Sequence, residues 1–164
     1  MKIFDLAFST DHYYIKRSTI VEQIQFNNRT FYAKFERIDE PFTPLLLKQH
    51  LDRQYTIALP LLENNKTNYL VIEYNGDEAQ RFYHLIIHLF KTLDISDYSI
   101  YQGKYAERLQ VFIHVSQLTL EEADAQLEYL SNSLKEKMSK KWKCLPSLHL
   151  PEAYNIVTLP HKIL

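Results

Sequence analysis

Glycine is almost absent from this sequence, which has two glycines in 164 residues against twelve tyrosines and nine phenylalanines. Loops that bind dinucleotides or nucleoside triphosphates need closely spaced glycines, because their backbone amides must approach the phosphates. With so little glycine, neither kind of loop can be built. The sequence therefore excludes both classes of nucleotide-binding protein.

Cysteine is equally scarce, because Cys144 is the only one. A single thiol can form neither an internal disulfide nor a multi-thiolate zinc site, which fits a reducing compartment. The first residues lack the apolar core of a secretion signal. No window approaches the roughly 18 consecutive apolar residues of a spanning helix. We therefore expect a cytoplasmic protein that has no membrane partner.

Strong net charge is also missing, since the formal charge is -1 at pH 7. The chain has no overall positive field of the kind that drives many nucleic-acid binders, so any such surface must be a local patch. Hydrophobic residues make up 46% and charged residues 24% of the chain, which is typical of globular proteins. The chain length is typical of a single domain, which we expect to span residues 1–164.

The first 62 residues predict an accessory region made of a hairpin and a short helix. Alternating apolar residues over 19–38 flank Asn27-Asn28, and asparagine tolerates the positive φ angles of a tight turn. Thr43-Pro44 then begins a helix that extends to about residue 52, with a hydroxyl N-cap followed by proline at the first helical position. A strand follows over 55–62.

Residues 63–164 predict a core with alternating strands and helices. We expect a strand at 68–73, a helix ending near 93, strands at 98–102 and 109–115, a helix beginning at 119, and a closing strand at 154–159. Asn75 and Glu78 have the spacing of a capping pair, and Thr119 and Glu122 have that of a capping box. This order predicts an α/β (α+β) fold, a ferredoxin-like or RNA-recognition-like (RRM-like) split βαβ core with an antiparallel sheet and helices packed on it.

Residues 45–160 resemble, in degenerate form, the core of the archaeo-eukaryotic primase superfamily, the primase-polymerases. The resemblance lies in the strand NYLVIEYN at 68–75, the hairpin at 98–115 and the segment YNIVTLP at 154–160. The whole chain also resembles an uncharacterised bacterial family of unknown function. The first resemblance implies a palm-like fold and metal-dependent nucleotidyl transfer.

The residues that such chemistry requires are substituted in this chain. The family places two aspartates, two residues apart, at the end of the first core strand, and these positions are Glu73 and Asn75. A neutral amide in place of a carboxylate weakens a divalent-metal site. The turn at 103–108 lacks the family's histidine, and the segment 141–144 lacks its third acidic residue. We therefore predict no catalytic residues and no cofactor, and we favour a protein that is not an enzyme.

Two other groups of residues are candidate sites. His84 and His88 are one helical turn apart, a spacing at which two imidazoles can share a metal, but with Asp77 and Arg81 they also fit a solvated helix face. The candidate nucleic-acid-binding residues combine positive charge with an aromatic ring. They are Lys104, Arg108, Lys140, Lys141, Trp142 and Lys143. Alternatively, the lysines accompany a helix C-terminus and Trp142 anchors the chain to the core.

The tyrosines leave two further interpretations open. Tyr13, Tyr14, Tyr98, Tyr101 and Tyr105 could form a base-stacking face, but aromatic residues are also ordinary strand formers.

The leading functional hypothesis is a non-catalytic, primase-like domain that acts by binding, with nucleic acid as the candidate partner. One alternative is a protein-interaction module or homodimer that does not bind nucleic acid. Another alternative is a residual metal-dependent nucleotidyl transferase or nucleotide hydrolase that uses Glu73, with Asp77 as a second candidate carboxylate.

Overall fold

The computed structural model describes residues 2–164. The chain forms two compact units, which are treated separately below. Unit 1 contains the residues up to Asn64 together with Leu148–Leu159, and unit 2 contains Asn65–Ser147 together with Pro160–Leu164. Nothing in the sequence indicated that residues 148–159 would join the N-terminal part of the chain in unit 1.

Unit 2 has the predicted ferredoxin-like plan. Its elements are β8 (Lys66–Asn75), α2 (Ala79–Thr92), β9 (Tyr98–Gln102), β10 (Arg108–Thr119), α3 (Leu120–Lys135), β11 (Trp142–Leu145) and β13 (Lys162–Ile163). The sheet order is β11-β8-β10-β9-β13, and every neighbouring pair is antiparallel. Without β13, the fourth strand of the βαββαβ unit lies beside the first, and the third lies between the first and second, as in a split βαβ fold.

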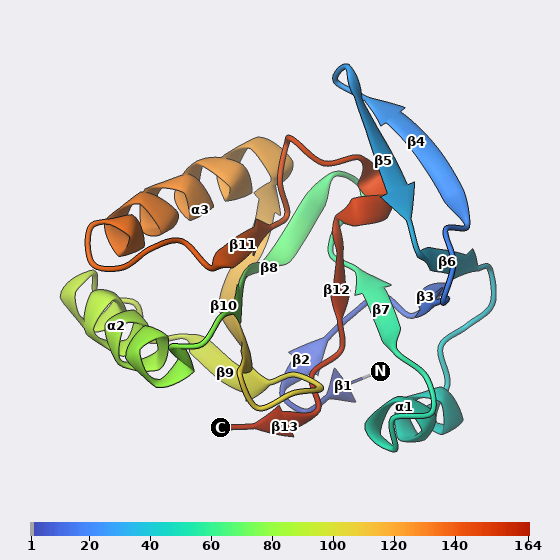
Figure 1. The fold of residues 1–164 in the computed structure, drawn as a ribbon, viewed down its shortest axis with the longest axis horizontal. Coiled ribbons are helices and arrows are strands. Elements are labelled where there is room, and N and C mark those ends of the chain that lie inside the picture. The colour runs from blue at the N-terminus through green and yellow to red at the C-terminus, as the bar shows by residue number, and fades with distance from the viewer. Residues whose placement is uncertain (1) are drawn as a thin grey trace. The chain divides into compact units, whose positions relative to one another are not determined.

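The two helices of unit 2 pack on one face of this sheet (Figure 1). Side chains alternate along a strand, so Leu70, Ile72 and Tyr74 of β8 all face the helices. The predicted apolar stripe of α2 supplies Phe82, Ile86 and Phe90, which are fully buried. The capping box of α3 is present, because the Thr119 side chain and Glu122 each bond the other's backbone N–H. One core therefore joins the sheet face and both helices.

The closing strand of unit 2 is β11, and the prediction that 154–159 closes this core is wrong. The observed β12 (Ile156–Thr158) pairs with β7 (Ile57–Pro60) in the sheet of unit 1. β11 and β12 are short strands of four and three residues. A side-chain pattern of this length specifies a strand but does not specify its partner.

The start of α2 also differs from the prediction, because Asn75 is the last residue of β8 and caps no helix. The N-cap residue is Glu78, whose backbone N–H donates to the Tyr74 hydroxyl at 2.9 Å. Gly76 makes this contact possible, since a Cβ at that position would lie 2.5 Å from the Tyr74 hydroxyl oxygen. The buried tyrosine thus replaces the expected asparagine as the capping group.

Unit 1 is built from short elements. They are β1 (Lys2–Ile3), β2 (Leu6–Ala7), β3 (Tyr13–Lys16), β4 (Glu22–Phe26), β5 (Arg29–Ala33), β6 (Phe35–Ile38), α1 (Pro44–Leu51), β7 and β12, with a short 3-10 helix at Glu152–Tyr154. Four strands form a sheet in the order β12-β7-β3-β6, whereas β1-β2 and β4-β5 are separate two-stranded sheets. The predicted hairpin is confirmed over residues 22–33, with Asn27 and Asn28 at φ angles of 49° and 61°. Residues 35–38, which we assigned to the same hairpin, form β6 and pair with β3. The predicted helix is also confirmed, since the Thr43 hydroxyl accepts the Leu46 N–H.

A buried histidine connects three parts of unit 1. His50 of α1 is fully buried, and its Nδ1 accepts the Ile57 N–H at 3.0 Å. Its Nε2 lies 2.8 Å from the Leu159 carbonyl oxygen and therefore carries the ring proton. The neutral imidazole links α1 to β7 and to the segment that returns from the C-terminal part of the chain.

Neither glycine of the chain adopts a positive φ angle, which is the conformation for which glycine is usually required. Instead, eight non-glycine residues in the described chain do so, and four of them are Asn27, Asn28, Asn64 and Asn65. Asparagine tolerates this region better than most residues. Among residues 2–164, no helix is long and apolar enough to cross a membrane.

Candidate nucleic-acid interface

Strand register in unit 2 brings several of the predicted site residues to one end of the sheet. Arg108 of β10 is opposite Asn75 of β8, and the Asn75 N–H donates to the Lys141 carbonyl at 2.8 Å just before β11. All three residues are exposed. They alternate with Tyr74, Leu109 and Trp142, which belong to the core beneath the helices. Asn75, Arg108 and Lys141 therefore form a row on the sheet face opposite α2 and α3.

A second row lies two residues further along each strand. Glu73 is opposite both Gln110 and Lys143. Its Oε2 accepts the Gln110 side-chain N–H at 3.1 Å, and its Oε1 lies 3.6 Å from the Lys143 ammonium. The Glu73 side chain is 18% exposed, whereas that of Lys143 is 69% exposed. We call these two rows, residues 73, 75, 108, 110, 141 and 143, the polar edge.

The polar edge carries more positive than negative charge. Arg108, Lys141 and Lys143 are cations, and Glu73 is its only carboxylate. Glu73 touches Lys143 and so offsets one of these charges. The two cations of the first row stay exposed on either side of the neutral Asn75. Such spacing suits an extended anionic backbone better than a compact metal ion.

The turn between β9 and β10 adds an exposed aromatic ring beside this edge. Tyr105 is 51% exposed, and the Arg108 guanidinium lies 5.4 Å from its ring centre. The Lys104 ammonium lies 5.9 Å from the same centre. The Gly103 N–H donates to the Arg108 carbonyl at 2.9 Å and closes the turn. The structure thus brings Lys104 and Arg108 together around Tyr105.

The other predicted aromatic contact is not available at the surface. Trp142 is 5% exposed, its ring lies 5.9 Å from that of Phe82, and its indole N–H donates to the Ser131 hydroxyl at 2.9 Å. A base cannot stack on an enclosed ring. Trp142 anchors β11 to the core, which was the alternative interpretation. Lys140, before this strand, is exposed.

The five candidate tyrosines separate clearly by burial. Tyr13, Tyr14 and Tyr101 are buried, and Tyr98 packs edge to face against Phe90 with ring centres 4.8 Å apart. Only Tyr105 of these five has a ring that is largely exposed. A sheet-wide stacking face of these tyrosines is therefore absent, and the aromatic surface is reduced to one turn.

Metal binding has little support from the geometry of residues 2–164. In this part of the chain, no three side chains of histidine, cysteine, aspartate or glutamate form a group that could hold a metal ion. His84 and His88 lie exposed on α2. Arg81, on the same helix, pairs with Glu78 at 3.3 Å and also donates to the Lys137 carbonyl at 2.7 Å. The exposed face of α2 fits the alternative interpretation.

Cys144 lies on the helix-covered side of β11, and burial raises the pKa of its thiol to about 11. A thiol with this pKa is protonated at neutral pH and is a poor nucleophile. This agrees with a structural thiol in the core.

Sequence reasoning missed one residue of the polar edge, Gln110, and one buried residue of unit 1, His50. Gln110, which is 3% exposed, donates to Glu73, and His50 holds unit 1 together. The βαββαβ order could have indicated Gln110, since the third strand of this plan lies beside the first. The contact of His50 with the Leu159 carbonyl joins residues 109 apart in the chain, and no local sequence pattern predicts it.

Comparison with known proteins finds a family match for the N-terminal part of the chain. Residues 1–68 match the model of a domain of unknown function, DUF1882. A search of curated proteins finds no match to this chain. The matched region covers the N-terminal part of unit 1 and ends four residues after Asn64, where unit 1 gives way to unit 2. The polar edge therefore lies outside the matched region.

Proposed function

We propose that unit 2 is a non-catalytic, primase-like binding domain that holds single-stranded nucleic acid along the polar edge. The observation that carries this proposal is the strand register, which aligns Arg108, Asn75 and Lys141 in one exposed row. Tyr105, with its two flanking cations, stands beside this row. Positive charges bind phosphates, and one exposed ring stacks on a base without regard to its identity.

Single strands fit this surface better than a duplex does. A duplex presents its stacked bases edge-on, so an exposed tyrosine finds no base face to cover. A single strand can turn a base onto Tyr105 while its phosphates follow the cations. The edge is short, which favours contact with a few nucleotides.

Glu73 supports binding over catalysis. Both of its carboxylate oxygens already have protein partners, Gln110 and Lys143. A divalent metal would have to displace Lys143 and would then find the neutral Asn75 as its neighbour two residues along the strand. The resemblance to primases places a third carboxylate near 141–144, and Lys143 occupies that region. We therefore favour a binding role over the residual nucleotidyl transferase that would use Glu73.

Fluorescence anisotropy with labelled oligo-dT and oligo-U over a series of salt concentrations tests the proposal. Three or four phosphate contacts predict that log K falls with log salt with a slope of about -2 to -3 for single strands. Tyr105→Ala should weaken binding about tenfold, because it removes a stacked base. Arg108→Gln or Lys141→Gln should each lower the salt slope by about 0.7.

Lys91→Gln on α2 is the matched control, since Lys91 is exposed and lies on the opposite side of the sheet from the polar edge. It should bind as the wild type does. If no oligonucleotide binds at low salt, or if Lys91→Gln weakens binding as much as Lys141→Gln does, the proposal is wrong. Incorporation of labelled nucleotides with Mg²⁺ or Mn²⁺ that is lost in Glu73→Ala would instead support the nucleotidyl transferase.

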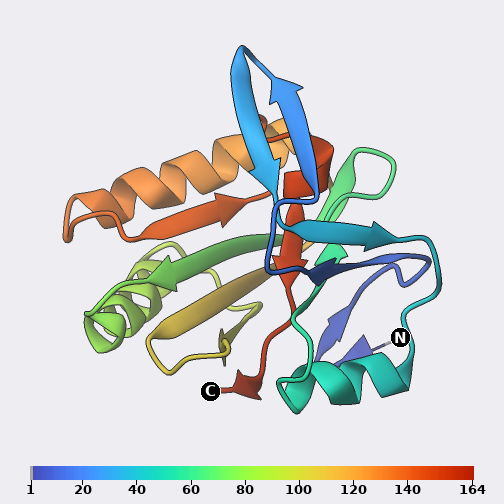
Figure 2. The ribbon, with the colours of Figure 1, turned by 45° about the vertical axis from the view of Figure 1, so that its right-hand side comes forward.

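A second candidate function is protein interaction through the β4–β5 hairpin of unit 1. These strands pair only with one another in the described sheets, as Figure 2 shows. Tyr32, on β5, is 53% exposed. Ile20, just before β4, is 52% exposed. Unpaired strand edges with exposed apolar side chains favour the addition of a partner strand. Light scattering should show a dimer, and Tyr32→Lys should dissociate it. A monomer at all protein concentrations would contradict self-association through the hairpin.

A further inference from the structure

A groove in unit 2 opens on the helix-covered side of the sheet, away from the polar edge. Its volume is about 670 Å³, within the range of about 300–1,000 Å³ that is common for small-molecule sites. Leu70, Ile113 and Leu130 line it, and all three are buried members of the unit 2 core. The groove therefore descends from the surface to the core between α3 and the loop that connects α2 to β9.

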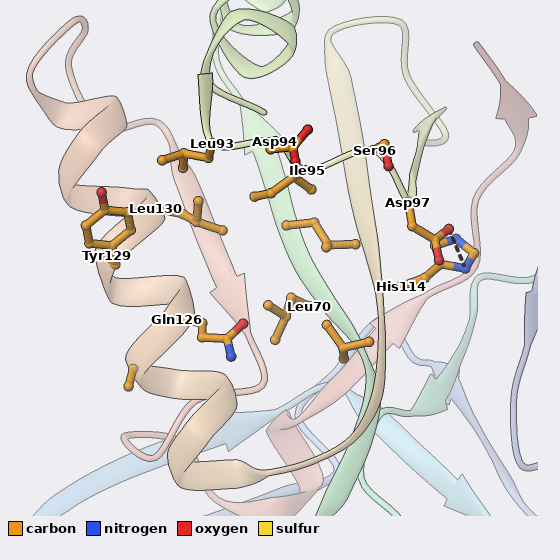
Figure 3. Close-up of a pocket in the computed structure, with 13 residues that line it drawn as sticks. Leu70, Leu93, Asp94, Ile95, Ser96, Asp97, His114, Gln126, Tyr129 and Leu130 are labelled. Carbon is orange, nitrogen blue, oxygen red and sulfur yellow. Dashed lines mark ion pairs between the residues drawn. The ribbon is translucent and has the colours of Figure 1, made fainter. Parts of the chain in front are cut away.

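The two walls of the groove are mainly apolar (Figure 3). Leu93 and Ile95 lie on the loop side. Gln126 reaches from α3 toward the floor, and the exposed Tyr129 lies on the rim. An aromatic ring or an alkyl chain would extend the core contacts into this space, and the Gln126 amide and Tyr129 hydroxyl would offer hydrogen bonds.

The segments that form both walls carry only negative formal charge. Residues 92–103 contain Asp94 and Asp97 and have no lysine or arginine. Residues 109–134 also have no lysine or arginine, and none of their four acidic side chains lines the groove. The carboxylates that line the groove, Asp94 and Asp97, therefore favour a cation at its rim over an anion.

Asp94 lines the groove at a position where local structure favours a different residue. It follows the end of α2 with a φ of 58°, its N–H donates to the Lys91 carbonyl, and the Ile95 N–H donates to the Phe90 carbonyl. These two bonds form a Schellman motif, whose left-handed position prefers glycine or asparagine. A carboxylate there also faces the negative end of the helix dipole. Asp94 therefore places a carboxylate at the C-terminal end of α2, where a cation is preferred, and beside the groove.

Asp97 has a structural partner and serves as a contrast. Its Oδ1 lies 3.9 Å from His114 Nδ1, and Figure 3 shows the two side chains turned toward one another. The Asp97 backbone carbonyl also accepts the His114 N–H at 2.9 Å. Asp94 is therefore the carboxylate on this rim that we assign to a ligand.

We propose that this groove binds a small organic cation, an apolar ring or chain that carries a protonated amine. The apolar part contacts Leu70, Leu130 and Ile95, and the ammonium group lies at the rim beside Asp94. The size of the groove, its apolar floor and the Asp94 carboxylate at its rim together favour this ligand class over an anion or a neutral apolar molecule.

Tryptamine and indole-3-propionate test the proposal, because the same indole and two-carbon chain carry an ammonium in one and a carboxylate in the other. Methyl NMR spectra of the full chain should shift at Leu70, Ile113 and Leu130 when tryptamine is added. Indole-3-propionate should bind at least about threefold more weakly, as expected for one partly exposed charge interaction. Asp94→Asn should abolish this preference and at the same time raise the melting temperature, because asparagine suits the left-handed position.

Glu128→Gln is the matched control, since it removes an exposed carboxylate of α3 that does not line the groove. It should retain the preference for tryptamine. Ala125→Phe, on the α3 wall, should block both compounds. Equal affinity for the two compounds in the wild type overturns the proposal, as does an unchanged preference in Asp94→Asn. These results are independent of oligonucleotide binding at the polar edge.

Discussion

The two units differ in how far along the chain their stabilising contacts reach. Unit 2 contains long elements whose ends are set by neighbouring residues, such as the Thr119–Glu122 capping box of α3. Unit 1 contains short strands, and its sheet takes β12 from the far end of the chain. The two units also differ in what is known of them and in the sites that they carry. DUF1882 matches part of unit 1, whereas the polar edge and the groove belong to unit 2.

The largest expected effect tests the dependence of unit 1 on distant contacts. His50→Ala removes both hydrogen bonds of a fully buried ring and leaves the Ile57 N–H and the Leu159 carbonyl without them. We expect unit 1 to lose about 3 kcal/mol of its free energy of unfolding. Hydrogen exchange should accelerate more in β7 than in β8.

His149→Ala is the control for this change, because His149 is exposed in the same unit. It should alter the free energy of unfolding by less than about 0.5 kcal/mol. Equal acceleration of exchange in β7 and β8 by His50→Ala would mean that the two units unfold together, and the comparison between them would fail.

The next effect tests a local contact in unit 2. In Gly76→Ala the new Cβ would lie 2.5 Å from the Tyr74 hydroxyl oxygen and 3.0 Å from the Lys141 Cβ. Tyr74 is buried, so it cannot swing away, and its hydroxyl caps α2. We expect a loss of about 2 kcal/mol in the free energy of unfolding, measured by urea denaturation.

The second glycine provides the control for Gly76. In Gly103→Ala the nearest atom to the new Cβ would be the Arg108 Cβ at 3.3 Å, which is a milder contact. We expect a change below about 1 kcal/mol. If Gly103→Ala proves as destabilising as Gly76→Ala, the contact with Tyr74 is not the reason for glycine at position 76.

The smallest effect concerns the start of α3 and its dependence on pH. Thr119→Ala should cost about 1 kcal/mol through loss of an N-cap. The Thr119 backbone N–H donates to Glu122 at 3.1 Å, and this bond lowers the pKa of the Glu122 carboxyl below its ordinary value of 4.5. The stabilisation is therefore present above pH 4.5 and is lost as the pH falls through the lowered pKa.

Glu122→Gln tests this pH dependence, since the amide keeps a hydrogen-bond acceptor but cannot titrate. Thermal unfolding of the wild type between pH 6 and pH 3 should lose stability more steeply than that of Glu122→Gln. Identical pH profiles would show that the charge of Glu122 contributes nothing to the start of α3.

Much of unit 2 could be predicted from the sequence because its signals are local and repeated. The apolar stripe of α2 and the apolar run of β8 fix the type of each element, and the order of the elements fixes the split βαβ plan. The partner of each short strand could not be predicted. β11 and β12 are both too short for their sequences to specify a partner, and tertiary packing decides that one pairs with β8 and the other with β7.

The candidate site was predictable in part. Charge and spacing indicated Lys104, Arg108 and Lys141, and strand register then brings Arg108 and Lys141 to one row. The role of Trp142 could not be decided, because a tryptophan beside lysines fits both a stacking surface and a core anchor. In the structure its ring is buried against Phe82, so Trp142 is a core anchor. The groove was missed altogether, since its walls come from α3 and the loop after α2.

The most direct test of the central claim is an NMR titration of the labelled full chain with a short single-stranded oligonucleotide. If the polar edge is the binding surface, the backbone amide signals of residues 73–75, 104–108 and 141–143 should shift together, and they should return as salt is added. Shifts confined to the exposed face of α2 or to unit 1, or no shifts at low salt, would contradict the account.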